Sequence, residues 1–164
     1  PDSTPEPNTE EPELTFPLTM TGTSTYYGVA FDYPESWRAE QESYQGVPYQ
    51  IFISDTALIV QITISTLDSE FQQQQNVFTP EDDINWQVAN VGASNIELIT
   101  KPTTTTVQGY PACTITYIKP WNGNWYRLIS IKKGNLIYRI RGVAQDPLYQ
   151  PETEAILNSF RFID

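Results

Sequence analysis

The stretch that decides the fold is GVAFDYPESW, residues 28–37. Its residues alternate between two faces, a period of two that is typical of a strand with one buried face. The apolar face of this expected strand consists of Val29, Phe31 and Tyr33. Pro34 should end the strand, because proline cannot donate a hydrogen bond to a neighbouring strand. We expect Trp37 to fold back and cover the end of the sheet.

The same stretch also holds groups that suggest a reactive site, namely Asp32 and Ser36. The chain contains no histidine, so the commonest general base and the imidazole metal ligand are both missing. Serine and cysteine triads, zinc-protease motifs and histidine metal clusters are therefore excluded in their usual forms. We interpret residues 28–37 as structural, and we expect no catalytic, cofactor-binding or metal-binding residue in the chain.

Further strands are expected on the C-terminal side of this stretch. Residues 49–54 and 57–66 are rich in β-branched side chains, and Asp55-Thr56 between them indicates a bend. The second segment predicts an inward row of Leu58, Val60, Ile62 and Ile64. Four later segments also read as strands: 97–108, 110–118, 125–133 and 135–144. Gly134-Asn135 is a tight hairpin signal between the last two.

Two helices are expected among these strands. Thr79 can cap a helix that begins at Pro80, and the acids of residues 80–83 are explained by their position at the positive end of its dipole. Its buried stripe should contain Ile84, Val88 and Val91, with Gly92 as the stop. A last helix should span about 151–159, and the polar run 71–76 is expected to be a solvated loop. Strands joined by short turns with helices against them predict an α+β fold with a largely antiparallel sheet.

The chain divides into a short tail and one domain. Residues 1–13 carry five acids, no base and no large apolar side chain, which predicts a disordered, acidic, proline-rich tether. Residues 14–164 are expected to form a single globular domain. The chain begins at Pro1 and not at methionine, which predicts an upstream segment, such as a signal peptide or a lipid-anchored leader.

The overall charge restricts the class of partner. The net charge is −11, and nine lysines and arginines are scattered along 164 residues. A nucleic-acid surface needs a basic stripe, so no nucleic-acid partner is expected. No run of about 18 apolar residues is present, so no transmembrane segment is expected in this chain.

The most site-like feature is the tryptophan-rich turn KPWNGNWYR, residues 119–127. A three-residue loop would make Trp121 and Trp125 cross-strand neighbours, and a two-residue loop would place them on opposite faces. The possible contacts to a ligand or partner are Trp121, Asn122, Trp125 and Tyr126. Aromatic side chains at a hairpin tip can stack on a sugar or dock a partner, but they can also merely cover the end of the sheet.

Three other groups of residues could form a functional site. Cys113 alternates with apolar neighbours and is expected in the core, not as a reactive thiol. Arg127, Arg139 and Arg141 can form a small basic patch, although ion pairs with surface acids are the simpler expectation. Two carboxyl groups could also form a hydrolase site. The test of this hypothesis is whether two acids converge in one pocket of the structure.

The order of these segments resembles the PsbP family, the extrinsic subunits of photosystem II and their bacterial relatives. The motifs that carry the resemblance are GVAFDYPESW, ALIVQITIST, TPEDDINWQVANVG, RLISIKKGNLIYRIRGVA and ILNSFRF. The resemblance implies an α/β/α sandwich with a central, mainly antiparallel sheet. It also implies a non-enzymatic protein of the lumen or cell envelope, often lipid-anchored in bacteria, that binds other proteins. The metal-binding histidines and basic docking patches of some plant members have no counterpart here.

The sequence therefore predicts an extracytoplasmic accessory protein of the cell envelope, tethered to a membrane and acting through an unidentified protein partner. The alternative is a module that binds a glycan or small ligand through the exposed aromatic residues of 119–127.

Overall fold

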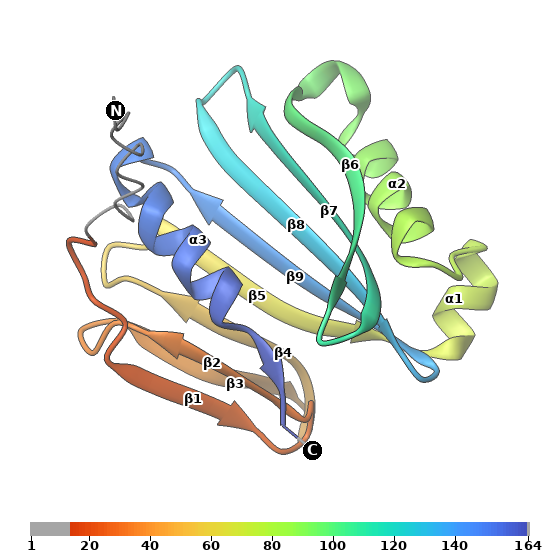
Figure 1. Cartoon of the computed structure of the whole chain (residues 1–164), viewed down its shortest axis with the longest axis horizontal. Coiled ribbons are helices and arrows are strands. Elements are labelled where there is room, and N and C mark those ends of the chain that lie inside the picture. The colour runs from red at the N-terminus through yellow and green to blue at the C-terminus, as the bar shows by residue number, and fades with distance from the viewer. Residues whose placement is uncertain (1–13, 164) are drawn as a thin grey trace, which may run out of the picture.

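The structure is a computed structural model that describes residues 14–163. The tether expected at residues 1–13 lies outside the described residues. The larger of two sheets has seven strands in the order β3-β4-β5-β9-β8-β7-β6, and every pair of neighbours is antiparallel. Its strands are β3 (Arg38–Tyr44), β4 (Val47–Ser54), β5 (Val60–Leu67), β6 (Glu97–Val107), β7 (Tyr110–Lys119), β8 (Asn124–Lys133) and β9 (Leu136–Ala144). Figure 1 shows how these strands twist across the molecule.

The stretch at residues 28–37 belongs to a second, smaller sheet. This sheet has the order β1-β2-β10, with β1 (Met20–Ser24), β2 (Val29–Tyr33) and β10 (Arg161–Phe162). As predicted, β2 ends before Pro34, whose carbonyl accepts a hydrogen bond from the amide of Trp37 at 3.0 Å. The indole of Trp37 is buried beside Phe16, with ring centroids 6.0 Å apart. The stretch therefore begins the domain core, as its apolar pattern predicts.

The helices are α1 (Ser69–Gln75), α2 (Pro80–Val91) and α3 (Gln150–Ser159), with short 3-10 turns at Ala93–Asn95 and Pro147–Tyr149. The start of α2 is confirmed, because Thr79 and Asp82 exchange the two hydrogen bonds of a capping box. The solvated loop expected at 71–76 is wrong, since most of it lies in α1. Asp68 caps this helix by accepting from the amide of Phe71, and Gln72 is buried within it.

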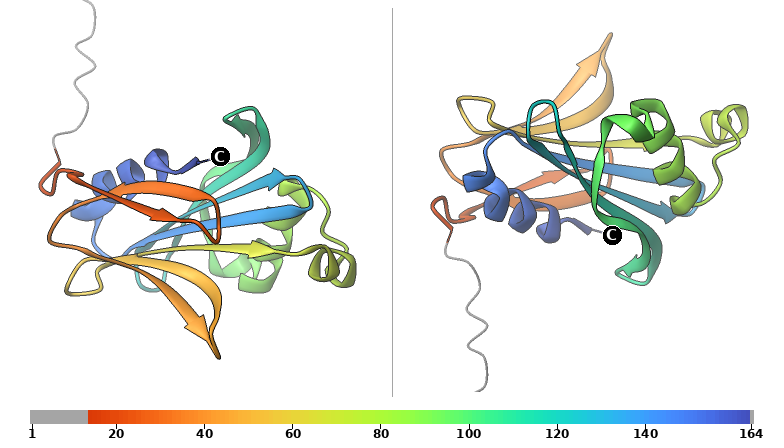
Figure 2. Two further views of the ribbon diagram at one scale, coloured as in Figure 1. Left: turned by 90° about the horizontal axis from the view of Figure 1, so that it is seen from below. Right: turned by 90° about the horizontal axis from the view of Figure 1, so that it is seen from above.

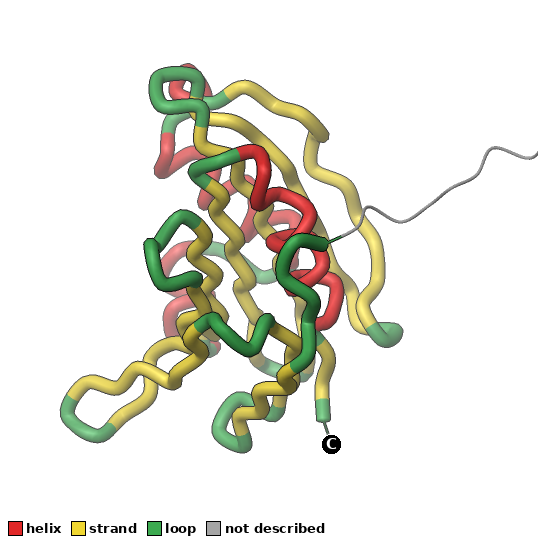
Figure 3. The backbone as a smooth tube through the Cα atoms, turned by 90° about the vertical axis from the view of Figure 1, so that its left-hand side faces the viewer, coloured by secondary structure: helices red, strands yellow, loops and turns green. Residues whose placement is uncertain are grey.

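The two faces of the large sheet are covered by different layers. The α3 face carries α3 and the small sheet, which pack on Ile129, Ile131 and Ile140. The α2 face carries α1 and α2, and Ile84 of α2 packs on Cys113, Ile115 and Leu128 there. Figure 3 shows the helices on either side of the strands. This arrangement is an α/β/α sandwich around an antiparallel sheet, which confirms the expected fold class.

The sequence placed the start of β5 too early. β5 begins at Val60, and Leu58 is an exposed turn residue with a φ of 59°, so it does not belong to the inward row. The turn is held by Asp55, whose carboxylate accepts a hydrogen bond from the amide of Val60 at 2.9 Å.

Strand β3, a polar strand at the edge of the large sheet, was not predicted from the sequence. Its sequence RAEQESY lacks the apolar alternation by which strands are recognised.

Candidate functional site

The tryptophan-rich turn joins β7 to β8 and has neither of the two expected loop lengths. Lys119 pairs with Asn124, so residues 120–123 form a four-residue connection. Gly123 has a φ of 73°, and its amide donates to the carbonyl of Lys119 at 2.8 Å. Asn122 accepts a hydrogen bond from the amide of Asn124 through its side-chain oxygen at 2.9 Å. Trp121 lies in this connection and is 74% exposed.

The other two aromatic residues of this turn are buried. Trp125 is 3% exposed and pairs with Ile118, so neither of the two placements considered for Trp121 and Trp125 is found. Tyr126 stacks on Tyr117 with ring centroids 4.9 Å apart. The four-residue connection moves Trp121 off the strand ladder, and of the four candidate contact residues Trp121 and Asn122 are exposed.

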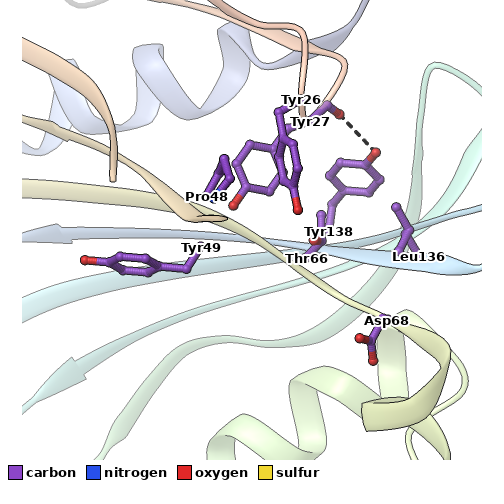
Figure 4. Close-up of a pocket in the computed structure, with 8 residues that line it drawn as sticks. All are labelled: Tyr26, Tyr27, Pro48, Tyr49, Thr66, Asp68, Leu136 and Tyr138. Carbon is purple, nitrogen blue, oxygen red and sulfur yellow. Dashed lines mark hydrogen bonds between the residues drawn. The ribbon is translucent and has the colours of Figure 1, made fainter. Parts of the chain in front are cut away.

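A pocket of about 430 Å³ lies at the other end of the sheet, on the α3 face. It is formed by the turn between β1 and β2, the start of β4, the end of β5 and the start of β9. The side chains that line it are Tyr26, Tyr27, Pro48, Tyr49, Thr66, Asp68, Leu136 and Tyr138 (Figure 4). We call this the tyrosine pocket. The tyrosine pocket was not predicted from the sequence, because its four tyrosines come from three separate segments.

The wall of the tyrosine pocket is fixed by contacts among its own residues. The hydroxyl of Tyr138 donates to the backbone carbonyl of Tyr27 at 3.0 Å. The rings of Tyr26 and Tyr27 meet edge to face at 4.9 Å, a favourable arrangement for aromatic rings. Burial, with a smaller contribution from Tyr26, raises the pKa of Tyr27 to about 12, so its hydroxyl stays protonated at neutral pH. The pocket therefore offers ring surface and tyrosine hydroxyl groups beside the carboxyl group of Asp68, which suit binding.

Next to this pocket, the hairpin of β3 and β4 projects from the body of the molecule (Figures 2 and 3). Its two-residue turn is Gln45-Gly46, with φ of 51° and 80°, the left-handed values that tight hairpins require. Tyr44 is 71% exposed, and Val47 and Tyr49 are also exposed. We call the surface formed by Tyr26, Tyr44, Val47 and Tyr49 the hairpin surface. It joins the tyrosine pocket through Tyr26 and Tyr49, which belong to both.

The three arginines of the last two long strands do not form one patch. Arg139 lies on the α2 face, where its Nε donates to Asp83 at 2.8 Å. Asp83 is completely buried, so its role goes beyond the dipole position that the sequence suggested. Arg141 lies on the same face, with its guanidinium carbon 5.3 Å from the ring centre of Tyr126. Arg127 lies on the opposite face, directly across from Gly142.

Cys113 is completely buried against α2, as its alternation with apolar residues predicts. Burial is the main cause that raises the pKa of its thiol, so the reactive thiolate is disfavoured.

Groups that could catalyse a reaction or hold a metal ion do not gather in the described residues. Among the described residues, Asp68 is the one carboxyl group that lines the tyrosine pocket, so no two acids converge there. In residues 14–163, histidine, cysteine and acidic side chains form no cluster of three or more that could hold a metal ion. The same range has no helix long and apolar enough to cross a membrane.

Comparisons with known proteins agree with this architecture. The solution structure of cyanobacterial PsbP (CyanoP) from Synechocystis sp. PCC 6803 is similar, with a TM-score of 0.60 and 11% sequence identity, over 87% of this chain and 91% of that one. A crystal structure from Bacteroides thetaiotaomicron VPI-5482 has a TM-score of 0.50 and 11% identity, over 88% of this chain and 48% of that one. Both likenesses concern the fold alone.

Among curated proteins, no sequence matches this chain. A family model described as PsbP-like protein matches residues 18–162, from just before β1 to the end of β10. That range includes all five motifs on which the resemblance was based. The chain therefore belongs to the PsbP-like family.

Proposed function

We propose that this protein is a non-enzymatic accessory protein that works outside the cytoplasm, tethered to a membrane, and binds a partner protein through the hairpin surface. Family membership supports the accessory role, since PsbP-like proteins are generally non-enzymatic accessory proteins. The acidic, proline-rich segment at residues 1–13 has the composition of a flexible tether.

The observation that carries the proposal is the exposure of Tyr44, Val47 and Tyr49 on a projecting hairpin. Exposed apolar side chains that gather in one place mark interaction sites. Tyrosine is enriched in protein interfaces because it offers a large contact area and loses little side-chain entropy. The adjoining tyrosine pocket can receive a side chain from the partner.

Site-specific photo-crosslinking tests the partner contact. A benzophenone amino acid replaces Tyr44 in one version of the full-length protein and Trp121 in another, and both are irradiated in cells of the source organism. We expect a discrete crosslinked product from position 44, which the substitution Tyr49→Ser removes. A product from position 121 alone would contradict the hairpin surface as the contact.

The export and tether are tested separately. The codons upstream of Pro1 should encode a signal sequence that ends in a cleavage site or a lipid-acceptor cysteine. An open reading frame that begins without one would refute export, whatever the crosslinking result.

A second candidate function is the binding of a glycan or small ligand by the 119–127 turn, favoured by the exposure of Trp121. Substituting Trp121 by alanine should then abolish any ligand-induced change in tryptophan fluorescence. The buried Trp125 serves as the control, because its emission should not respond to a ligand at the surface. An unchanged titration of the Trp121→Ala variant would remove this candidate.

A further inference from the structure

A second concave site lies on the α3 face, away from the hairpin surface. It is a groove of about 220 Å³ between α3 and β6, above the middle of β7 and β8. Its floor is apolar and consists of core residues, namely Ile129, Ile131, Ile140, Leu157 and Phe160. Its polar rim includes Thr106, Thr114 and Asn158. One charged side chain lines this groove, that of Arg127, and no acid is among the described residues that line it.

The guanidinium of Arg127 has almost no partner within the described part of the chain. Its Nε donates to the hydroxyl of Thr114 at 3.4 Å, a long hydrogen bond. No ion pair involves it there, although the protein carries 20 acids and has a net charge of −11. Its two terminal nitrogens, Nη1 and Nη2, therefore donate to no residue in the range 14–163. A part-buried cation beside an apolar floor is unfavourable unless an anion neutralises it.

We propose that this groove binds a small apolar carboxylate. The carboxylate oxygens would accept two parallel hydrogen bonds from the terminal nitrogens of Arg127, the bidentate geometry to which a planar guanidinium is suited. The apolar chain of the ligand would lie on Ile129, Leu157 and Phe160. The hydrogen bond to Thr114 uses Nε, so the two terminal nitrogens stay available for the ligand.

The size of the groove restricts the ligand. Its volume of about 220 Å³ is below the 300–1,000 Å³ that is usual for pockets of drug-sized molecules. The ligand is therefore a short-chain fatty acid, or the apolar C-terminal residue of a peptide with its free carboxylate. The two share the same chemistry, and separate measurements distinguish them.

Calorimetric titration of the whole chain with sodium hexanoate is the first measurement, with hexanol and hexylammonium as matched controls at constant ionic strength. We expect saturable binding of hexanoate in the millimolar range or tighter, and no binding of the two controls. In a parallel series, a short peptide ending in Ile with a free carboxylate is compared with its amide. Tighter binding of the free-acid peptide than of hexanoate identifies a peptide terminus as the ligand, and the reverse identifies a fatty acid.

Four variants test the role of Arg127. Arg127→Gln should weaken hexanoate binding at least about tenfold, as expected for the loss of hydrogen bonds to a charged group. Arg127→Lys keeps the charge but loses the planar fork, so its binding should be intermediate. Thr105→Trp fills the groove from its exposed rim, because Thr105 pairs with Ala112 and its side chain lies on the α3 face. It should abolish binding without disturbing the core. Arg141→Gln removes an arginine on the opposite face that likewise has no acid partner among the described residues, and this variant should bind like the wild type.

Each variant is first checked for a native circular dichroism spectrum and melting temperature. Arg127→Lys and Thr105→Trp keep the test valid should Arg127→Gln fail to fold. The proposal is overturned by equal binding of hexanol, by hexanoate affinity within twofold of wild type in both Arg127 variants, or by the absence of saturable binding of both hexanoate and the free-acid peptide.

Discussion

Arg139 and Arg127 lie on neighbouring strands of one sheet, yet their surroundings differ completely. On the α2 face, Arg139 is paired with the buried carboxylate of Asp83 and lies 4.8 Å from the ring centre of Trp86 and 5.5 Å from that of Phe71. On the α3 face, Arg127 has one long contact to a threonine and borders an apolar groove.

This difference distinguishes an arginine that stabilises the fold from one that is available for a ligand. The counter-ion of Arg139 is Asp83 of α2, so their ion pair holds α2 on the sheet. Arg127 lacks one among the described residues, so an external carboxylate can provide it. The four predictions below test this contrast.

The largest effect is expected for Asp83→Ala. It leaves the guanidinium of Arg139 part-buried without its counter-ion, so the free energy of unfolding should fall by about 3–5 kcal/mol. Chemical denaturation measures this loss. Glu81→Gln, an exposed acid in the same helical turn, is the control and should lose about 0.3–1 kcal/mol.

A double replacement isolates the charge effect. In Asp83→Leu with Arg139→Met, both charges are absent, and most of the stability lost in Asp83→Ala should return. If Asp83→Ala were as stable as the wild type, the ion pair between Asp83 and Arg139 would not stabilise the fold.

A smaller effect is expected at Gly142, which lies directly across from Arg127. A methyl group at this position would lie 2.8 Å from Cδ1 of Leu157 and 3.0 Å from Cγ2 of Thr153. Gly142→Ala should therefore push α3 away from the sheet and destabilise the protein by about 1–3 kcal/mol. Thermal unfolding measures this, and an unchanged melting temperature would mean that Leu157 moves aside freely.

Arg141 provides an intermediate case, because it has an aromatic partner in Tyr126 but no acid partner within residues 14–163. Arg141→Gln should destabilise the fold by about 0.5–1 kcal/mol, as for an exposed cation above a ring. The matched variant Tyr126→Leu should remove the dependence on Arg141 in a double-mutant cycle. A coupling energy of zero would show that the two side chains do not interact.

The smallest effect is expected for Arg127→Gln without ligand, within about 0.5 kcal/mol of wild type. Within the described part of the chain, its guanidinium makes one long hydrogen bond, to Thr114, and so has little to lose. Denaturation in the absence of carboxylates measures this, and buffers such as acetate are avoided. A loss as large as that in Asp83→Ala would contradict the contrast, since it would make Arg127 a structural residue as well.

The sequence predicted those parts of the fold that depend on local patterns. The alternation in residues 28–33, Pro34 as a strand end and the Thr79–Asp82 capping box each have a local physical cause, and each is confirmed. The turn at Gly134-Asn135 is confirmed as well, because β8 ends at Lys133 and β9 begins at Leu136. These signals extend over a few neighbouring residues.

Features that depend on distant contacts were missed or misread. α1 has a polar sequence, and its buried Gln72 donates to the carbonyl of Asn135 and accepts from Lys132. Those partners lie about sixty positions away, so the sequence pattern resembled a solvated loop. The tyrosine pocket likewise joins residues from three segments. The period of two places Arg127 and Arg139 on strands, but only the pairing of the strands shows that they lie on opposite faces.

Nuclear magnetic resonance of the arginine Nε–Hε groups during a hexanoate titration tests the central claim most directly. Both arginines report in the same sample, so Arg139 serves as the internal reference. The account predicts a saturable shift of the Arg127 signal, with the Arg139 signal unchanged. An unchanged Arg127 signal, or equal shifts of both, would contradict the claim that Arg127 is the arginine reserved for a ligand.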